Sequence, residues 1–173
     1  MLKLAKTRFA SYYLTFRWLE KARQALTNLV CVESWNKINT GRDGANAFKD
    51  TVLDIYFWSQ VKYVLQFTKP IYYMIKFGDS DRPIIGEVYE QMDSMLGQIK
   101  DIVEPRDINL YNYIRAEVEN RWEMLNVPLH ALAYVLTPKY YHPSWLSTPA
   151  PGGGEARENH TKIKRFTKNI WLH

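Results

Sequence analysis

The sequence contains few of the features that cross-link a chain or direct it to a membrane. Cys31 is the only cysteine, so an intrachain disulfide is excluded and a reducing compartment fits best. No stretch approaches the roughly 18 consecutive apolar residues of a membrane-spanning helix. The opening residues also lack the apolar run and the cleavage site of a signal peptide. We therefore expect an intracellular protein, nuclear or cytoplasmic, that is not secreted and has no membrane partner.

Patterns that hold phosphates or metal ions are missing as well. There is no glycine fingerprint after a strand and no GxxxxGK[ST] loop, and the glycine run 152–154 has the composition of a linker. The histidines have no paired partners at zinc spacing. Several carboxylates lie at helical neighbour spacing, but beside or opposite apolar stripes, which favours a solvated face over a metal site. These carboxylates are Asp50, Asp54, Glu87, Glu90 and Asp93.

Two further residues with reactive side chains have structural interpretations. Cys31 lies in the apolar segment LVCV, which indicates a buried thiol, and a nucleophilic cysteine would need a positioned base. His130 lies one turn into an apolar segment, where a partly buried residue bonded to the backbone is expected. We therefore predict no catalytic residue, no metal, no cofactor and no enzymatic activity.

Charge is distributed unevenly along the chain. The 173 residues have a formal net charge of +5, which mildly favours polyanionic partners. Positions 1–32 contain Lys3, Lys6, Arg8, Arg17, Lys21 and Arg23 against the single acid Glu20. Positions 79–107 are acidic, with carboxylates outnumbering Arg82, Lys100 and Arg106. We expect a basic N-terminal part and an acidic middle.

The apolar pattern predicts an all-α fold. Spacing of three, four and seven residues dominates, and no segment alternates long enough to indicate a sheet. We predict an irregular helical bundle of about five to seven helices in a helical domain at 1–141. Residues 142–173 are rich in Pro, Gly and Ser and then basic, which predicts a flexible linker and a basic tail in which a short helix could form over 162–171.

The first half of the chain should contain two long helices and a short one. The first is capped by Thr7, and the second runs over about 47–67 until Pro70 breaks or kinks the chain. A short helix over 71–77 then ends at Gly78. Residues expected to face inward are Phe9, Tyr12, Phe16, Leu19, Leu26 and Val30 in the first helix, and Val52, Ile55, Tyr56, Val61 (or Trp58) and Leu65 in the second.

The second half should contain three more helices. Asp79 or Asp81, followed by Pro83, predicts the start of one that stops before Pro105. Asp107 caps the next helix, and an apolar helix restarts after Pro128, over 127–136. The inward residues expected here are Ile85, Val88, Met92, Met95, Ile99 and Ile102, then Tyr111, Ile114, Val118, Trp122 and Leu125.

The segment KTRFASYYLTFRWLEKARQAL, at 6–26, is the best candidate for a binding surface. Basic side chains attract phosphates and aromatic faces can stack on unpaired bases. The alternative is that its aromatic residues only pack in the core; Trp18 and Tyr13 lie off the inward stripe. The predicted nucleic-acid contacts are Arg8, Phe9, Arg17, Trp18, Lys21 and Arg23.

Two blocks of the sequence resemble the hAT family of DNA transposases, in the form found in plants. TRFASYYLTFRWLEKARQAL, at 7–26, resembles the family's Thr-Arg-Trp/Phe-x-Ser block. RWEMLNVPLHALAYVLTPKYY, at 121–141, is similar to a later block in which Arg-Trp and Pro-Leu-His precede Leu-x-Pro-Lys-Tyr-Tyr. The segment at 61–100 is similar to the linking helices, so the resemblance covers roughly residues 5–155.

The resemblance implies a helical domain inserted into an RNase H-like core. In the family, two aspartates precede the first block and a glutamate follows the second, and these hold two divalent cations. This chain starts after the first place and ends before the second, and Glu155 and Glu158 lack the expected surroundings. The family's Arg-aromatic pair, whose aromatic ring can stack on a base, corresponds to Arg8 and Phe9, where Phe replaces the usual Trp.

We therefore expect a catalytically inactive, transposase-derived helical domain with weak, sequence-tolerant affinity for DNA or RNA. The alternative is a protein-interaction or self-association module that exposes apolar surface.

Overall fold

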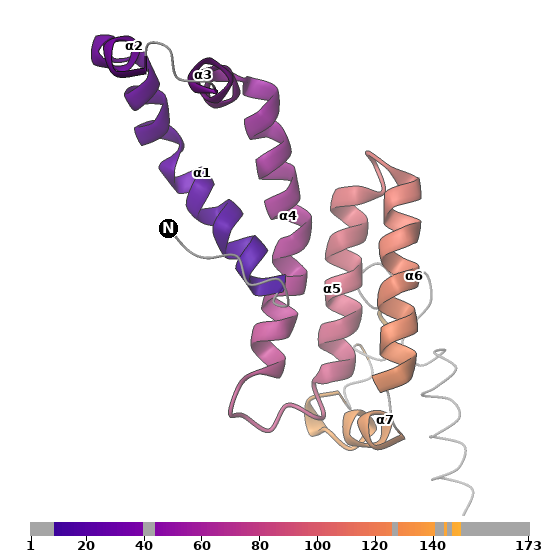
Figure 1. The fold of residues 1–173 in the computed structure, drawn as a ribbon. Coiled ribbons are helices and arrows are strands. Elements are labelled where there is room, and N and C mark those ends of the chain that lie inside the picture. Colours follow the sequence, from indigo (N-terminus) through magenta and orange to yellow (C-terminus); the bar gives the residue numbers. More distant parts are fainter. Residues whose placement is uncertain (1–8, 40–43, 126–127, 141–143, 145–146, 150–173) are drawn as a thin grey trace, which may run out of the picture. The chain divides into compact units, whose positions relative to one another are not determined.

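The structure is a computed structural model that describes residues 9–39, 44–125, 128–140, 144 and 147–149 (Figure 1). Its helices are α1 (Phe9–Cys31), α2 (Glu33–Asn39), α3 (Ala45–Leu53), α4 (Ile55–Gly78), α5 (Val88–Val103), α6 (Ile108–Leu125), α7 (Pro128–Val135) and the 3-10 turn η1 (Pro138–Tyr140). The predicted all-α fold is confirmed for these residues. None of the helices described has the length and apolar content needed to cross a membrane.

The chain divides into two compact units, residues 1–69 and residues 70–173. Helix α4 is continuous across the boundary between them. The predicted division into a helical domain at 1–141 and a tail at 142–173 stays a prediction. Most of that tail, and the predicted cap Thr7, lie outside the described residues.

The core of unit 1 is organised around Trp58 of α4, which is only 3% exposed. Its indole Nε1 donates a hydrogen bond of 2.7 Å to the backbone oxygen of Val52 near the end of α3. The guanidinium carbon of Arg23, from α1, lies 5.2 Å from the centroid of the Trp58 ring. The bond to Val52 gives the buried indole N–H the acceptor that it needs. Through its contacts with Val52 and Arg23, the Trp58 side chain connects α4 with α3 and α1.

Helix α1 packs against α2 and α3, and its rotation differs from the predicted one. Tyr13 is buried, with 7% of its surface exposed, whereas Tyr12 is 45% exposed. The inward assignment of Tyr12 and the outward assignment of Tyr13 were therefore wrong. Neighbouring residues in a helix project about 100° apart, so a modest rotation of the helix exchanges them. Val30 is buried as predicted, and Phe16, Leu19 and Leu26 are half-buried.

The predicted second helix is two helices in the structure. The break lies at Asp54, whose backbone is extended and whose Oδ1 accepts a 2.8 Å hydrogen bond from the backbone N–H of Tyr56. Ile55 and Tyr56, predicted to face inward, are instead 78% and 70% exposed because they form the first turn of a new helix. Trp58 and Val52 are buried as predicted. Val61 is also buried.

Pro70 does not end the helix in which it lies. Helix α4 continues through it and ends at Gly78, so the predicted separate helix at 71–77 is the last part of α4. An interior proline removes one helical hydrogen bond. The helix continues despite this loss, and Pro70 itself is buried.

The core of unit 2 is aromatic. Helix α5 packs against α6 and α7, and Tyr89, Tyr134 and Tyr140 are buried together with Trp122 against them. The Tyr89 ring centroid lies 4.9 Å from that of Tyr134, which lies 4.8 Å from that of Tyr140. Ile99 and Val103 of α5 are fully buried. Figure 1 shows α5 and α6 running alongside each other.

The start of α5 was predicted too early. The helix begins at Val88 with Glu87 at its N-cap, so Asp79 and Asp81 do not cap it, and Ile85 is exposed. The residues before it form turns, with the backbone N–H of Glu87 donating to the oxygen of Ile84 at 2.8 Å.

Two other boundaries of unit 2 were predicted correctly, and the start of α7 was predicted to within one residue. Helix α5 stops before Pro105, α7 begins at Pro128, and Asp107 caps α6 by accepting a 2.9 Å hydrogen bond from the backbone N–H of Leu110. Met95, Ile99 and Tyr111 are buried as predicted. Six further residues that were predicted to face inward are half-buried: Val88, Met92, Ile102, Ile114, Val118 and Trp122. The side chain of Leu125 lies outside the description.

Candidate nucleic-acid interface

Three of the predicted nucleic-acid contacts lie together on α1. Arg17, Trp18 and Lys21 are all exposed, and 52% of the Trp18 surface is accessible. Residues three and four apart are neighbours on a helix surface, so Lys21 lies beside both Arg17 and Trp18. We refer to Arg17, Trp18 and Lys21 as the α1 patch. Two cations and an accessible indole therefore share about one turn of helix.

The cations of the α1 patch are available to a ligand. Within the part of the chain that the structure describes, neither Arg17 nor Lys21 forms an ion pair. One turn further along, Gln24 Nε2 donates a 2.9 Å hydrogen bond to Asn28 Oδ1, so the row continues with neutral polar side chains. Unpaired cations on a hydrated helix face can exchange their counterions for phosphates without breaking an internal contact.

Arg23 does not belong to this patch. It follows Lys21 by two residues and so projects about 200° away from it around the helix. Its guanidinium group lies over the ring of Trp58, where a cation–π contact contributes to the packing of unit 1. Arg23 is also exposed, and its assignment to nucleic-acid contact stays a prediction. Arg23 therefore has a packing role that Arg17 and Lys21 do not have among the described residues.

The two remaining predicted contacts cannot be placed. Arg8 lies outside the described residues. Phe9 is the first residue of α1, and its side chain also lies outside the description. Their assignment to nucleic-acid contact stays a prediction.

The α1 patch continues into an apolar row that the sequence analysis missed. Trp18, Ala25 and Leu29 are exposed and follow one another at steps of seven and four residues. That spacing places them along one side of α1, apart from the half-buried Phe16, Leu19 and Leu26. The spacing of this exposed row could be found in the sequence. The inward stripe already explained the helical period of the apolar residues, so a second apolar row was not considered.

The reactive side chains that the structure describes do not converge on a site. Cys31 is exposed, so the predicted buried thiol was wrong: the residue ends α1 just before a bend. Across the described ranges, no group of three or more His, Cys, Asp or Glu is placed to hold a metal ion. His130 is half-buried, as predicted, and its ring centroid lies 5.9 Å from that of Trp122.

A shifted pKa occurs in the core of unit 2. Burial, with a smaller contribution from the charge of Asp93, raises the pKa of Tyr89 well above its ordinary value. Nearby, the hydroxyl of Tyr134 donates a 3.3 Å hydrogen bond to Glu90 Oε2. A phenol kept protonated among packed rings serves the core, and it lies on α5 rather than on the α1 patch.

No protein-family model, curated protein or solved structure matches this chain. The resemblance to hAT transposases therefore rests on the sequence segments at 7–26, 61–100 and 121–141 alone. The support for the candidate interface is the charge, exposure and spacing of its own residues.

Proposed function

We propose that this chain binds nucleic acid weakly and without sequence preference through the α1 patch. The observation that carries the proposal is the exposure of Arg17 and Lys21 on neighbouring turns of α1, with no internal ion pair among the described residues. Cations of this kind contact backbone phosphates, which are the same for every sequence.

The experiment is a binding titration of the full chain with a fluorescein-labelled oligonucleotide, first at low salt and then at physiological salt. The double variant Arg17→Gln, Lys21→Gln should lose most of the affinity, since two phosphate contacts are removed. The single variants Arg17→Gln and Arg23→Gln form the matched pair, because each removes one positive charge from the same helix and only Arg23 lies outside the patch. Arg23→Gln should destabilise unit 1 by about 0.5–1 kcal/mol and leave binding nearly unchanged.

The proposal fails if the wild-type chain retains no oligonucleotide at low salt. It also fails if Arg23→Gln weakens binding as much as Arg17→Gln does. In that case net charge, rather than the α1 patch, would determine the affinity.

The sequence blocks support a second part of the proposal, that the chain is a hAT transposase-derived helical domain without catalytic activity. Transposase activity requires carboxylates that hold two divalent cations. Incubation of labelled hairpin DNA with the full chain and Mg²⁺ or Mn²⁺ should leave the DNA intact. Metal-dependent cleavage that survives further purification would contradict the absence of activity.

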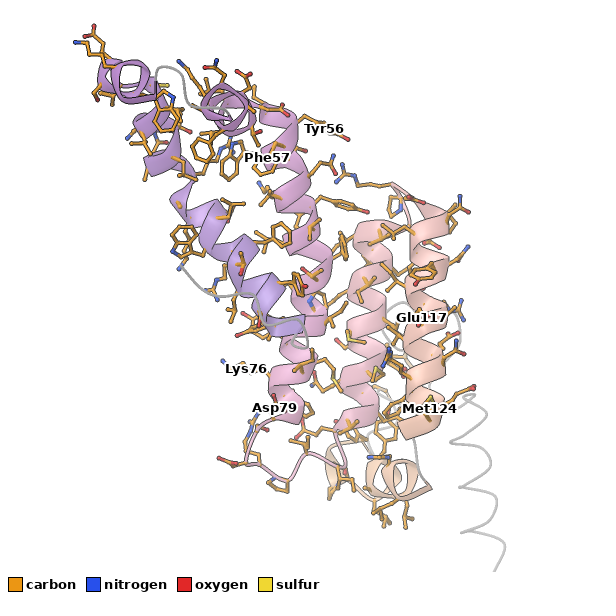
Figure 2. The ribbon with its side chains drawn as sticks, viewed as in Figure 1. Tyr56, Phe57, Lys76, Asp79, Glu117 and Met124 are labelled. Carbon is orange, nitrogen blue, oxygen red and sulfur yellow. The ribbon has the colours of Figure 1, made fainter. Side chains whose placement is uncertain are left out.

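A second candidate function, self-association, is favoured by the apolar surface of unit 1. The first turn of α4 exposes most of Ile55 and Tyr56, the latter labelled in Figure 2, and Leu53 beside them is 44% exposed. Adjacent exposed apolar side chains of this size are typical of interaction surfaces. Sedimentation over a concentration series should show a dimer that Ile55→Glu abolishes. A monomer at every concentration would exclude self-association through this surface.

A further inference from the structure

The exposed indole of the α1 patch indicates which form of nucleic acid it recognises. We infer that Trp18 stacks on an unpaired base, so that the ligand is single-stranded DNA or RNA rather than a duplex. This inference rests on the proposed function and adds the ligand class to it.

Trp18 differs from every other tryptophan that the structure describes. The rings of Trp35 and Phe48 are stacked at 5.6 Å, Trp58 lies under Arg23 and donates to Val52, and Trp122 meets Tyr89 at 5.9 Å. Within the described residues Trp18 forms no ring contact and half of its surface is exposed. Leaving a large apolar ring in water is unfavourable, which is consistent with a ring that a ligand covers.

The neighbours of Trp18 match the chemistry of an unpaired strand. Arg17 precedes Trp18 in the chain, and Lys21 lies one turn away from both. The two cations can therefore contact the backbone phosphates next to a base that lies against the indole. Sites for single strands combine such cations, which follow the backbone, with aromatic rings on which bases stack. Stacking does not depend on the hydrogen-bonding edge of the base, so it preserves the tolerance of sequence.

A duplex cannot use the same ring. Its bases are already stacked on each other and present only their edges in the grooves, while its phosphates remain outside. Arg17 and Lys21 therefore contact either form, but Trp18 contributes only to the single strand. Substitutions can therefore separate the contribution of charge to the binding affinity from the contribution of stacking.

The test compares one labelled oligothymidine of about 20 nucleotides with its duplex, at the same salt concentration and with the full chain. Base–aromatic stacking of the usual strength corresponds to a roughly 5- to 150-fold change in Kd. Trp18→Ala should weaken single-strand binding by a factor in that range and change duplex binding less than about twofold. Trp18→Phe keeps an aromatic face and should retain most of the affinity.

Tyr113→Ala is the matched control, because Tyr113 is also an exposed aromatic residue on a helix, 66% exposed on α6. It should change neither affinity. Thermal melts of all variants check that folding is retained.

The outcomes separate this inference from the proposed function. Equal losses on the two ligands, or no loss on either, would overturn the role of Trp18 while the charge-based proposal stands. If Trp18→Ala leaves both affinities intact but lowers the sedimentation coefficient, the indole contacts protein, and the inference is also overturned. If the wild-type chain binds neither ligand, the proposed function itself is wrong.

Discussion

At the scale of single residues, Gly86 occupies a tightly packed position in unit 2. A methyl group there would clash with Thr137 Oγ1 and lie 3.1 Å from the backbone oxygen of Ala133. Thr137 cannot easily move away, since its hydroxyl donates a 2.7 Å hydrogen bond to that same oxygen. We expect Gly86→Ala to lower the free energy of unfolding by about 1–3 kcal/mol.

Chemical denaturation measures this loss, and two variants control it. Gly78→Ala adds the same methyl group where no atom lies within 4 Å, so it should change stability little. Combining Gly86→Ala with Thr137→Ala removes the clashing oxygen and should restore part of the stability. Equal effects at Gly78 and Gly86 would show that the loss of backbone freedom, and not the close approach, dominates.

Tyr89 gives the fold a predicted sensitivity to alkaline conditions. Because its pKa is raised in the folded chain, the folded state holds the phenolic proton more tightly than the unfolded state does. The stabilisation is fully present below the unfolded pKa of about 10 and is lost as pH rises above it. Stability should therefore fall above about pH 10, and it should fall less in Tyr89→Phe.

Melts of the wild type and Tyr89→Phe at neutral pH and near pH 10.5 test this difference. The exposed Tyr113 supplies the control, since Tyr113→Phe should leave the alkaline loss as it is in the wild type. Parallel loss of stability in the wild type and in Tyr89→Phe would contradict the account.

At the scale of elements, the start of α6 depends on a single side chain. Asp107 Oδ1 accepts from the backbone N–H of Leu110, one of the donors that an uncapped helix leaves unsatisfied. Asp107→Ala should destabilise the chain by about 0.5–2 kcal/mol, and Asp107→Asn should retain most of the stability. Urea titrations of both variants, with Asp101→Ala in the last turn of α5 as the control, distinguish a cap from a general charge effect.

Helix boundaries were predictable where a residue determines them locally. Pro105, Asp107 and Gly78 act through their own backbone or side chain, and the structure confirms what they predicted. The break at Asp54 was not predictable, because an aspartate in a helical pattern also fits a solvated face. Only the structure shows its extended backbone and its bond to Tyr56.

The candidate interface was partly predictable for the same kind of reason. Exposure of Trp18 followed from its place off the inward stripe. The exchange of Tyr12 and Tyr13, and the position of Arg23 over Trp58, depend on how α1 is rotated against its neighbours. That rotation is determined by packing partners that are distant in the sequence. The apolar pattern of one helix carries no information about those partners.

At the scale of the whole molecule, the position of a charge matters more than the sum. A net charge of +5 would support diffuse attraction to any polyanion. Acidic residues are concentrated in the chain between 79 and 107, whereas Arg17 and Lys21 are exposed on α1 without ion pairs among the described residues. Binding should therefore depend on two particular cations.

The salt dependence of single-strand binding tests this claim most directly. Each phosphate contact contributes about 0.7 to the slope of log Kobs against log salt concentration for a single strand. The variant Arg17→Gln, Lys21→Gln should therefore show a slope smaller by about 1.4, while Arg23→Gln keeps the wild-type slope. A slope that stays the same when both patch cations are removed would contradict the assignment of nucleic-acid binding to α1.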